Sequence, residues 1–294
     1  MPGWMGAGRV YGQEVLVGWC VVIGGLALVG YGRSLAGVTR AQRMVRVPGR
    51  IVAVEEPAHD GRKGKGIPVL ISFQDPSTGQ EFTLPNKGGN ELPIEVAWKG
   101  REIGILFRPG RPEDFSTTFD LEYGRHGVAL PNFAVFLVYA ALVTSAALTW
   151  GYQWALIGAG IPWTVVAGVA SRHEIRLAKG RLARLTAAPA VPGRIVSVTR
   201  SVHTDQDGTL VSFAPVVSFT TREDTTVIGF CPFDVTNPSG SRGREVTVRY
   251  QPGDPAEFTL DLADTRRDLW GVVRFDLSVL LVGVAAVVAG LYLL

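Results

Sequence analysis

The chain has 294 residues, of which 47% are hydrophobic and only 19% are charged, and its formal net charge is +3. Soluble globular proteins carry about 25% charged residues. This composition excludes an ordinary soluble enzyme and a disordered chain, and two cysteines are too few for a disulfide-stabilised scaffold. It indicates a membrane protein.

The charged residues are concentrated in two windows, and residues 127–171 between them contain no Lys, Arg, Asp or Glu. We therefore expect a membrane α-helical plus all-β fold, with four transmembrane helices and two small barrel-like β domains. The expected segments are an N-terminal tail and first span (1–32), a first β domain (33–126), a helical hairpin (127–171), a second β domain (172–270) and a last span (271–294).

The first apolar segment, Val15–Tyr31, has only Glu14 and Arg33 as flanking charges. A helix of about 20 apolar residues crosses a hydrocarbon core about 30 Å thick. A cleaved signal peptide is the alternative, but its basic residues precede the apolar run. Here the basic residues follow the run, which favours a membrane span.

The first polar window shows the alternation of apolar and polar residues that is typical of half-buried strands. Strands are expected at 50–55, 69–73, 82–84 and 103–107. The first of them is apolar enough to be covered on both faces. Pro109-Gly110 fits the central positions of a type II turn, and Pro112 is expected to end the strand pairing.

The uncharged segment 127–171 is too long for one membrane-spanning helix, so it must fold back on itself. Trp150–Gln153 is the expected turn, because Trp and Tyr favour the membrane–water interface. This places spans at about 130–149 and 153–170, and Pro162 is expected to kink the second.

A basic segment, Ser171–Thr186, follows the hairpin, with apolar residues at helical spacing. It predicts either a short helix lying on anionic headgroups or a plain basic flank that stops translocation. The basic residues expected near lipid headgroups on the two flanks are Arg40, Arg43, Arg172, Arg176, Lys179, Arg181 and Arg184.

The second polar window repeats the first. Val47–Val52 and Val191–Val196 are the same six residues, and Gly100–Phe115 recurs as Gly243–Phe258. Strands are expected at 215–219, 226–230 and 246–250, with a second type II turn at Pro252-Gly253 and a strand end at Pro255. The unit of span, β domain and span therefore occurs twice, which predicts an internal duplication.

The last span is expected at about 272–293, with Arg274 and Asp276 in its first turn. Basic residues flank the spans on the side of the two polar windows, whereas the hairpin turn carries none. The positive-inside rule then places both β domains in the cytoplasm and both chain ends outside. Cys20 lies in a span and Cys231 in a β domain, so the two thiols are expected to stay free.

Motifs for catalysis or metal binding are missing from the sequence: it has no paired histidine spacing, Cys-x-x-Cys, nucleophile elbow or Walker loop. We expect no enzyme, no cofactor and no metal site. Two strand-connecting tips differ in charge between the copies, which is typical of divergent binding loops. The candidate interaction residues are Arg62, Lys63 and Lys65 in one tip and His203, Asp205 and Asp207 in the other, together with loops 85–99 and 231–242.

Small residues four apart in the spans predict close helix packing, within the chain or between copies. These pairs are Ala141 and Ser145, Ala155 and Ala159, and Ala286 and Gly290.

The repeated Val-Pro-Gly-Arg-Ile-Val string, a strand ending in Ser-Phe, and Gly243–Pro255 together resemble the DUF3592 family of bacterial membrane proteins. The resemblance implies a small β domain between transmembrane helices and assigns no catalytic residue. The second copy fits the pattern better than the first, which has Phe107 and Arg111 where the second has Tyr250 and Asp254. NfeD-like proteins offer a looser resemblance, since they too carry a small β-barrel beside membrane helices.

The sequence thus predicts a non-enzymatic integral protein of a bacterial cell membrane whose two cytoplasmic β domains act as interaction or scaffold modules. Its expected partners are membrane lipids and an unidentified protein, with homo-oligomers left open and no nucleic acid. The alternatives are an oligomeric transporter or channel subunit, which would use Asn132 and Asp276, and an accessory factor to a membrane enzyme in the manner of NfeD.

Overall fold

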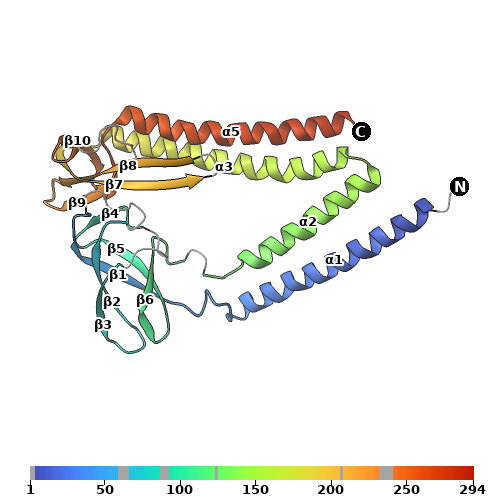
Figure 1. The fold of residues 1–294 in the computed structure, drawn as a ribbon, viewed down its shortest axis with the longest axis horizontal. Helices are drawn as coiled ribbons and strands as arrows, with labels where there is room; N and C mark the ends of the chain where they lie inside the picture. Colours follow the sequence, from blue (N-terminus) through green and yellow to red (C-terminus); the bar gives the residue numbers. More distant parts are fainter. Residues whose placement is uncertain (1–3, 59–65, 87–92, 123–124, 206–207, 232–240) are drawn as a thin grey trace. The chain divides into compact units, whose positions relative to one another are not determined.

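The computed structural model describes residues 4–58, 66–86, 93–122, 125–205, 208–231 and 241–294 (Figure 1). The chain divides into two compact units. The helical unit contains Met1–Arg43, Gly124–Ala178 and Leu269–Leu294, and the β unit contains Met44–Tyr123 and Lys179–Asp268.

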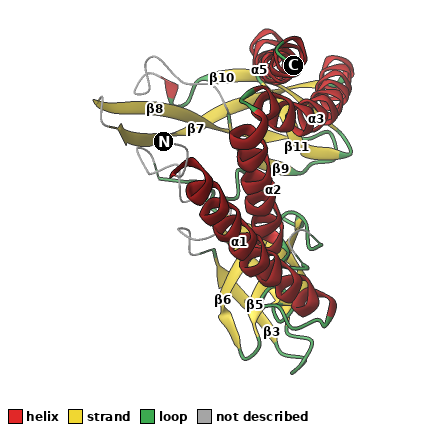
Figure 2. Ribbon diagram, turned by 90° about the vertical axis from the view of Figure 1, so that its right-hand side faces the viewer, coloured by secondary structure: helices red, strands yellow, loops and turns green. Residues whose placement is uncertain are grey.

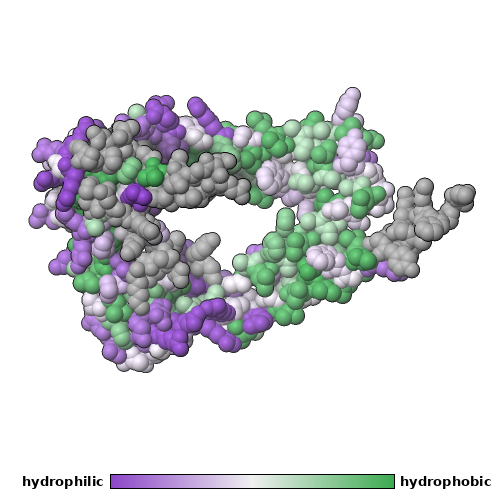
Figure 3. Space-filling model, viewed as in Figure 1, coloured by the Kyte–Doolittle hydropathy of each residue, from purple (hydrophilic) through white to green (hydrophobic). Residues whose placement is uncertain are grey.

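Among the residues that the structure describes, four helices are long and apolar enough to cross a membrane, as predicted. They are α1 (Trp4–Leu35), α2 (Ala129–Trp150), α3 (Gln153–Ala187) and α5 (Leu262–Tyr292). Only 6% of the apolar window in α1, and 6% of that in α2, is buried inside the protein. Figure 3 accordingly shows hydrophobic residues at the surface of the helices.

The turn between α2 and α3 lies where the sequence predicts it. Gly151 ends α2 with a φ of 109° and donates its N–H to the carbonyl of Ala147 at 3.0 Å. A positive φ of this kind favours glycine, because other residues meet a steric penalty there. The indole rings of Trp150 and Trp154 meet edge to face across the turn, with centroids 5.7 Å apart.

Figure 2 shows α1 beside α2 and α3 beside α5. Within the helical unit, glycine permits both pairs of helices to approach closely. A Cβ on Gly30 would lie 2.8 Å from Cγ of Pro131, and a Cβ on Gly160 would lie 2.7 Å from Cγ2 of Val287. Gly290, one of the small residues expected to mediate packing, is equally close to Ile157. Small residues therefore set the helix contacts, as in membrane helix pairs.

The first copy folds into a five-stranded antiparallel sheet with the order β3-β2-β1-β5-β6. Its strands are β1 (Val45–Val54), β2 (Val69–Gln74), β3 (Glu81–Pro85), β5 (Glu102–Arg108) and β6 (Arg111–Thr118). All four predicted strands are present. The first is covered less than expected: Ile51 is fully buried, whereas Val52 and Val54 are half-buried.

The second copy folds into a sheet with the equivalent order, β11-β10-β7-β8-β9, extended by β4 (Val96–Trp98) of the first copy. Its own strands are β7 (Ala190–Asp205), β8 (Gly208–Thr220), β9 (Thr226–Phe230), β10 (Glu245–Gln251) and β11 (Asp254–Thr259). The two sheets are curled and antiparallel, in agreement with the predicted mixture of helices and small β domains.

The two sheets match in register as well as in order. Gly49 pairs with Phe73 in the first, and Gly193 pairs with Phe219 in the second. A bulge follows at the same place in each copy, after Ile51 and after Ile195. A bulge is a specific local feature of a strand pair, so its recurrence extends the sequence repeat to backbone geometry.

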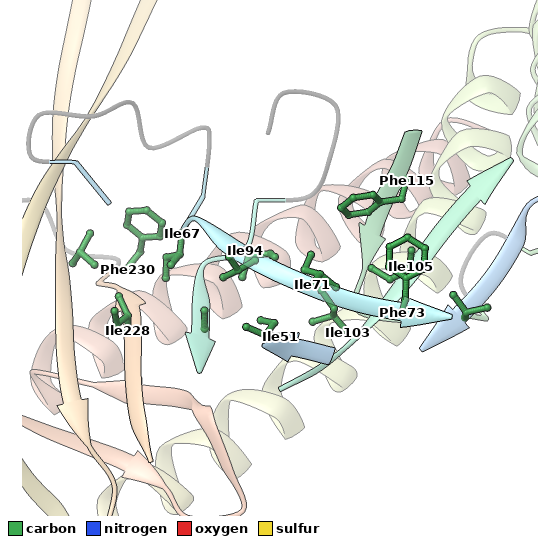
Figure 4. Packing of buried hydrophobic residues seen from close by; sticks show 14 of the residues in the cluster. Ile51, Ile67, Ile71, Phe73, Ile94, Ile103, Ile105, Phe115, Ile228 and Phe230 are labelled. Atoms are coloured by element: carbon green, nitrogen blue, oxygen red, sulfur yellow. The ribbon is translucent and has the colours of Figure 1, made fainter. Parts of the chain in front are cut away.

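Strand β4 joins the two sheets. Ala97 pairs with Ile228 of β9, and the amide of Phe230 donates to the carbonyl of Glu95 at 2.8 Å. One hydrophobic cluster accordingly contains buried residues of both copies, including Ile67 and Ile94 from the first and Phe230 from the second (Figure 4). A second cluster around Val217, Tyr250 and Phe258 belongs largely to the second sheet.

The prediction that two prolines end the strand pairing is wrong. Pro112 and Pro255 each lie at the second position of a strand, β6 and β11 respectively. Both are edge strands of their sheets, and an edge strand can accommodate a residue that has no N–H. Gly110 has the positive φ of a type II turn, at 75°, whereas Gly253 does not adopt a positive φ.

Two helices are longer than predicted, so that two charged residues lie further inside one of them than expected. Helix α5 begins at Leu262, so Arg274 and Asp276 lie beyond its third turn rather than in its first. Helix α3 continues through the basic segment to Ala187 without a break. The segment 171–186 is therefore the end of a long helix and not a separate short one.

Candidate interaction surfaces

The most distinctive surface of the β unit is a two-stranded ribbon formed by the far ends of β7 and β8. Its pairs run from Arg200 with Phe213 to Asp205 with Gly208. Among the described residues, β9 and β10 pair with β7 and β8 only nearer the base, at 216–220 and 190–194. We call these strand ends, residues 200–205 and 208–213, the ribbon.

The residues of β7 just before the ribbon are buried, whereas the ribbon residues Arg200 and Val211 are exposed. Val198 is fully buried and Thr199 is 1% exposed, whereas Arg200 is exposed and Val211 is 39% exposed. An isolated two-stranded hairpin is marginally stable in water. A ribbon of this kind is suited to pairing or packing with another surface.

The predicted interaction residues are distributed as follows. His203 and Asp205 lie in strand β7, within the ribbon, and not in a loop as the sequence suggested. Arg62, Lys63, Lys65 and Asp207 lie outside the described residues. The loop expected at 85–99 contains β4, and in the loop expected at 231–242 the thiol-bearing Cys231 is fully buried.

The ribbon and β4 are the two features that the sequence analysis missed. The signal for the ribbon was a pair of runs rich in Val, Thr and Ser on either side of Asp205–Gly208, a segment typical of a tight hairpin. The three residues of β4 are too few to produce a periodic pattern, so their pairing partner is visible only in the structure.

Five of the expected headgroup residues are exposed without a described ion-pair partner: Arg40, Arg43, Arg172, Arg176 and Lys179. Two others contact protein. Arg184 forms a two-pronged pair with Glu257, both distances being 3.0 Å, and Arg181 lies 3.7 Å from the same carboxylate. The hydrogen bonds from Arg184 to Glu257 raise the pKa of its guanidinium.

The end of α3 is attached to the β unit through more than charge. Leu185 is fully buried and Ala188 is 6% exposed, so the apolar face of the last turns packs on protein. An interfacial helix would instead present this face to lipid. Arg181 and Arg184 therefore contribute to attachment of the helix end through Glu257.

Arg101 is a partly buried cation of the β unit. Its guanidinium lies 4.8 Å from the ring centroid of Trp98 and 5.4 Å from that of Phe119, and it donates to the carbonyl of Val96. Burial lowers the pKa of Arg101, and the carboxylate of Asp254 in the second copy opposes that effect. Its position beside β4 indicates a structural role at the junction of the two sheets.

No group of three or more His, Cys, Asp or Glu side chains that could hold a metal ion occurs among the described residues. The free thiols of Cys20 and Cys231 are in different units, as expected.

Comparison with known proteins adds no relative: no family model, no curated protein and no solved structure matches the chain. The similarity to the DUF3592 family therefore stays a prediction carried by the motif residues.

Proposed function

We propose that this protein is a non-enzymatic integral membrane protein that presents a joined pair of β sheets at the cytoplasmic face as an interaction scaffold. The observation that carries the proposal is the ribbon, a two-stranded extension of β7 and β8 beyond the sheet that supports its base. Neither β9 nor β10 pairs with the described residues of the ribbon, and its Arg200 and Val211 are exposed, so the ribbon offers a surface for a partner protein.

Membrane insertion is supported by the four apolar helices and by the exposure of their side chains. Leu28 is 74% exposed, Leu130 is 76% exposed and Val166 is 68% exposed. Apolar patches of this extent are unfavourable in water and are typical of membrane or partner contact. Basic residues beside the β windows, including Arg40 and Arg172, favour a cytoplasmic β unit and an outward hairpin turn.

We also propose that the chain arose by duplication of a unit of helix, β sheet and helix. The amide of Gly100 donates to Ile51, and the amide of Gly243 donates to Ile195, each at 2.7 Å. These residues occupy the same places in the two copies, and both glycines have a positive φ. The shared sheet order and bulge support the same origin.

The ribbon's role is tested by photo-crosslinking of the full-length protein in the native membrane. A photoreactive residue is placed at Val211 on the ribbon or, as the control, at Thr83, an exposed position on edge strand β3. In a second variant, Asn-Gly replaces residues 202–211, because a two-residue turn preserves the pairing of Ser201 with Ser212.

We expect a discrete adduct with another protein from Val211 and none from Thr83. A photoreactive residue at Arg200 should give the same adduct, and shortening the ribbon should abolish it. The scaffold proposal is contradicted by equal adducts from Thr83 and Val211, by an Arg200 adduct that survives the shortened ribbon, or by no adduct at all.

A further inference from the structure

An apolar groove with a basic rim lies between α1 and α2 in the helical unit. Its volume is about 470 Å³, within the range of about 300–1,000 Å³ that is usual for ligand sites. Ile23, Leu26, Phe133 and Leu137 contribute to its walls, and Arg33 and Arg40 lie at its rim.

The floor of the groove is built by the close contact of the two helices. Gly30 lies against Pro131, and the hydroxyl of Tyr31 donates to Oδ1 of Asn132 at 2.6 Å. These contacts join the last turns of α1 to the first turns of α2 and leave the groove walls facing outward. Leu26 is 60% exposed and Phe133 is 56% exposed.

The basic rim is held in place by hydrogen bonds. Thr39 donates its hydroxyl to Oε1 of Gln42 at 2.7 Å, and Gln42 donates in turn to the carbonyl of Ser34 at 2.8 Å. Ser34 itself is buried and donates to the carbonyl of His126 at 2.9 Å. This network fixes the segment that carries Arg33 and Arg40 against the start of the second helix.

The two rim arginines have no carboxylate at ion-pair distance within the described part of the chain. The corresponding positions of the second copy differ. Arg184 corresponds to Arg40 and is paired with Glu257, and Leu177 corresponds to Arg33. Among the described residues, two guanidinium groups without an ion-pair partner therefore lie at the rim of this groove, whereas the corresponding residues of the second copy are Leu177 and the ion-paired Arg184.

We propose that this groove binds one anionic phospholipid of the cytoplasmic leaflet. An acyl chain would lie along the apolar walls, while Arg33 and Arg40 would bind the phosphate, which guanidinium groups recognise with two parallel hydrogen bonds. Two neighbouring cations disfavour the ammonium of a zwitterionic headgroup. The inference rests on the proposed membrane insertion and adds a specific lipid site to it.

The test is native mass spectrometry of the purified full-length protein in detergent, titrated with phosphatidylglycerol or phosphatidylcholine. The wild type should retain one phosphatidylglycerol in preference to phosphatidylcholine. The double variant Arg33→Gln/Arg40→Gln should lose about tenfold or more in affinity, because each cation near a headgroup contributes about 1 kcal/mol.

The matched control is Arg172→Gln/Arg176→Gln, which removes the same charge from exposed positions outside the groove. It should retain the lipid. A second variant, Leu26→Trp, fills the groove at an exposed position and should also lose the lipid, whether or not the arginine variant folds. Free glycerol 3-phosphate should not displace the bound lipid.

The proposal is overturned if the two arginine double variants lose the same affinity for phosphatidylglycerol. It is also overturned if Leu26→Trp retains the lipid, or if glycerol 3-phosphate displaces it. Extraction of native membranes at alkaline pH tests insertion separately. A protein that stays in the membrane but shows no preference for phosphatidylglycerol contradicts the lipid site alone, whereas an extracted protein contradicts the proposed function too.

Discussion

The two copies have sheets with the same strand order, but they differ in how each sheet is connected to its helices. In the first copy, α1 ends at Leu35 and β1 begins at Val45, and a loop also separates β6 from α2. In the second copy, α3 continues to Ala187, three residues before β7, and α5 begins at Leu262, three residues after β11.

Glycine conformation explains part of this difference. Gly37 and Gly127 have φ values of 72° and 63°, which a helix cannot contain, and they occur in the two connections of the first copy. Gly271 corresponds to Gly127 but lies inside α5. The same residue type at the same repeat position therefore permits a loop in one copy and a helix in the other.

The largest expected effect concerns the core that the sheets share. Ile94→Ala should cost about 2–5 kcal/mol, the usual range for removing a buried branched side chain. Because Ile94 lies in the cluster with residues of both copies, hydrogen exchange should accelerate in β2 and in β9 together.

Val248→Ala is the matched control, since Val248 is fully buried in the cluster of the second sheet. It should accelerate exchange in β9 and leave β2 protected. If Ile94→Ala instead affects one sheet alone, the two sheets are energetically independent and the joined core is refuted.

The paired glycines provide the next test. Gly127→Ala should destabilise the protein by about 1–2 kcal/mol, because a positive φ is unfavourable for residues with a Cβ. Gly271→Ala should stabilise it by up to about 1 kcal/mol, because the residue is helical and has open space around its Cβ. The melting temperatures of both variants, measured in one detergent, test the difference. Equal shifts of the same sign would contradict the explanation from glycine conformation.

A smaller effect is expected from the corresponding arginines. Arg184→Gln breaks the pair with Glu257 and should lower thermal stability, with a difference that shrinks at high salt. Arg40→Gln, measured in lipid-free detergent, should leave stability unchanged. Equal destabilisation by the two substitutions would show that Arg40 also has a structural partner.

The smallest effect is a dependence on pH confined to the first sheet. In the turn between β2 and β3, the carboxylate of Asp75 accepts hydrogen bonds from the hydroxyl and the amide of Ser77, which lower its pKa below the ordinary value of 3.8. The corresponding residue is Thr221, whose hydroxyl accepts a hydrogen bond from the amide of Thr225 at 3.2 Å.

A lowered pKa means that this stabilisation is complete above the unfolded value and is lost as the pH falls through the folded value. Asp75→Ala should therefore melt slightly earlier than the wild type at neutral pH and equal it in strong acid. Thr221→Ala should show a difference that does not depend on pH. If the difference in melting temperature between Asp75→Ala and the wild type does not change with pH, the charge of the Asp75 carboxylate does not stabilise the turn.

Much of the architecture follows from local patterns. The four apolar helices, the turn at Trp150–Gln153 and the strand at Thr226–Phe230 were all predicted, because hydropathy and alternation depend on neighbouring residues. Helix ends were predicted less well. The long extension of α3 contains Gly180 and many charges, yet it stays helical to Ala187, and its Leu185 is fully buried.

The candidate sites were harder to predict than the fold. His203 and Asp205 were expected in a loop but lie in strand β7, because the pairing that extends this strand depends on register over many residues. Of the two arginines at the rim of the groove between α1 and α2, the sequence predicted a lipid-facing role for Arg40 only. That Arg40 lies near Arg33 and Phe133 depends on the contact of two helices that an entire β sheet separates in the sequence.

The orientation of the β unit is tested most directly by cysteine labelling from one side of the membrane. Single cysteines replace Gln80 in the turn between β2 and β3, Arg222 in the turn between β8 and β9, and Tyr152 in the hairpin turn, all of them exposed, in a Cys20→Ser/Cys231→Ala background. A membrane-impermeant maleimide should label Tyr152→Cys in intact cells stripped of their wall, and Gln80→Cys and Arg222→Cys only after lysis. Labelling of either sheet position from outside would contradict the account of a cytoplasmic scaffold built from two joined copies.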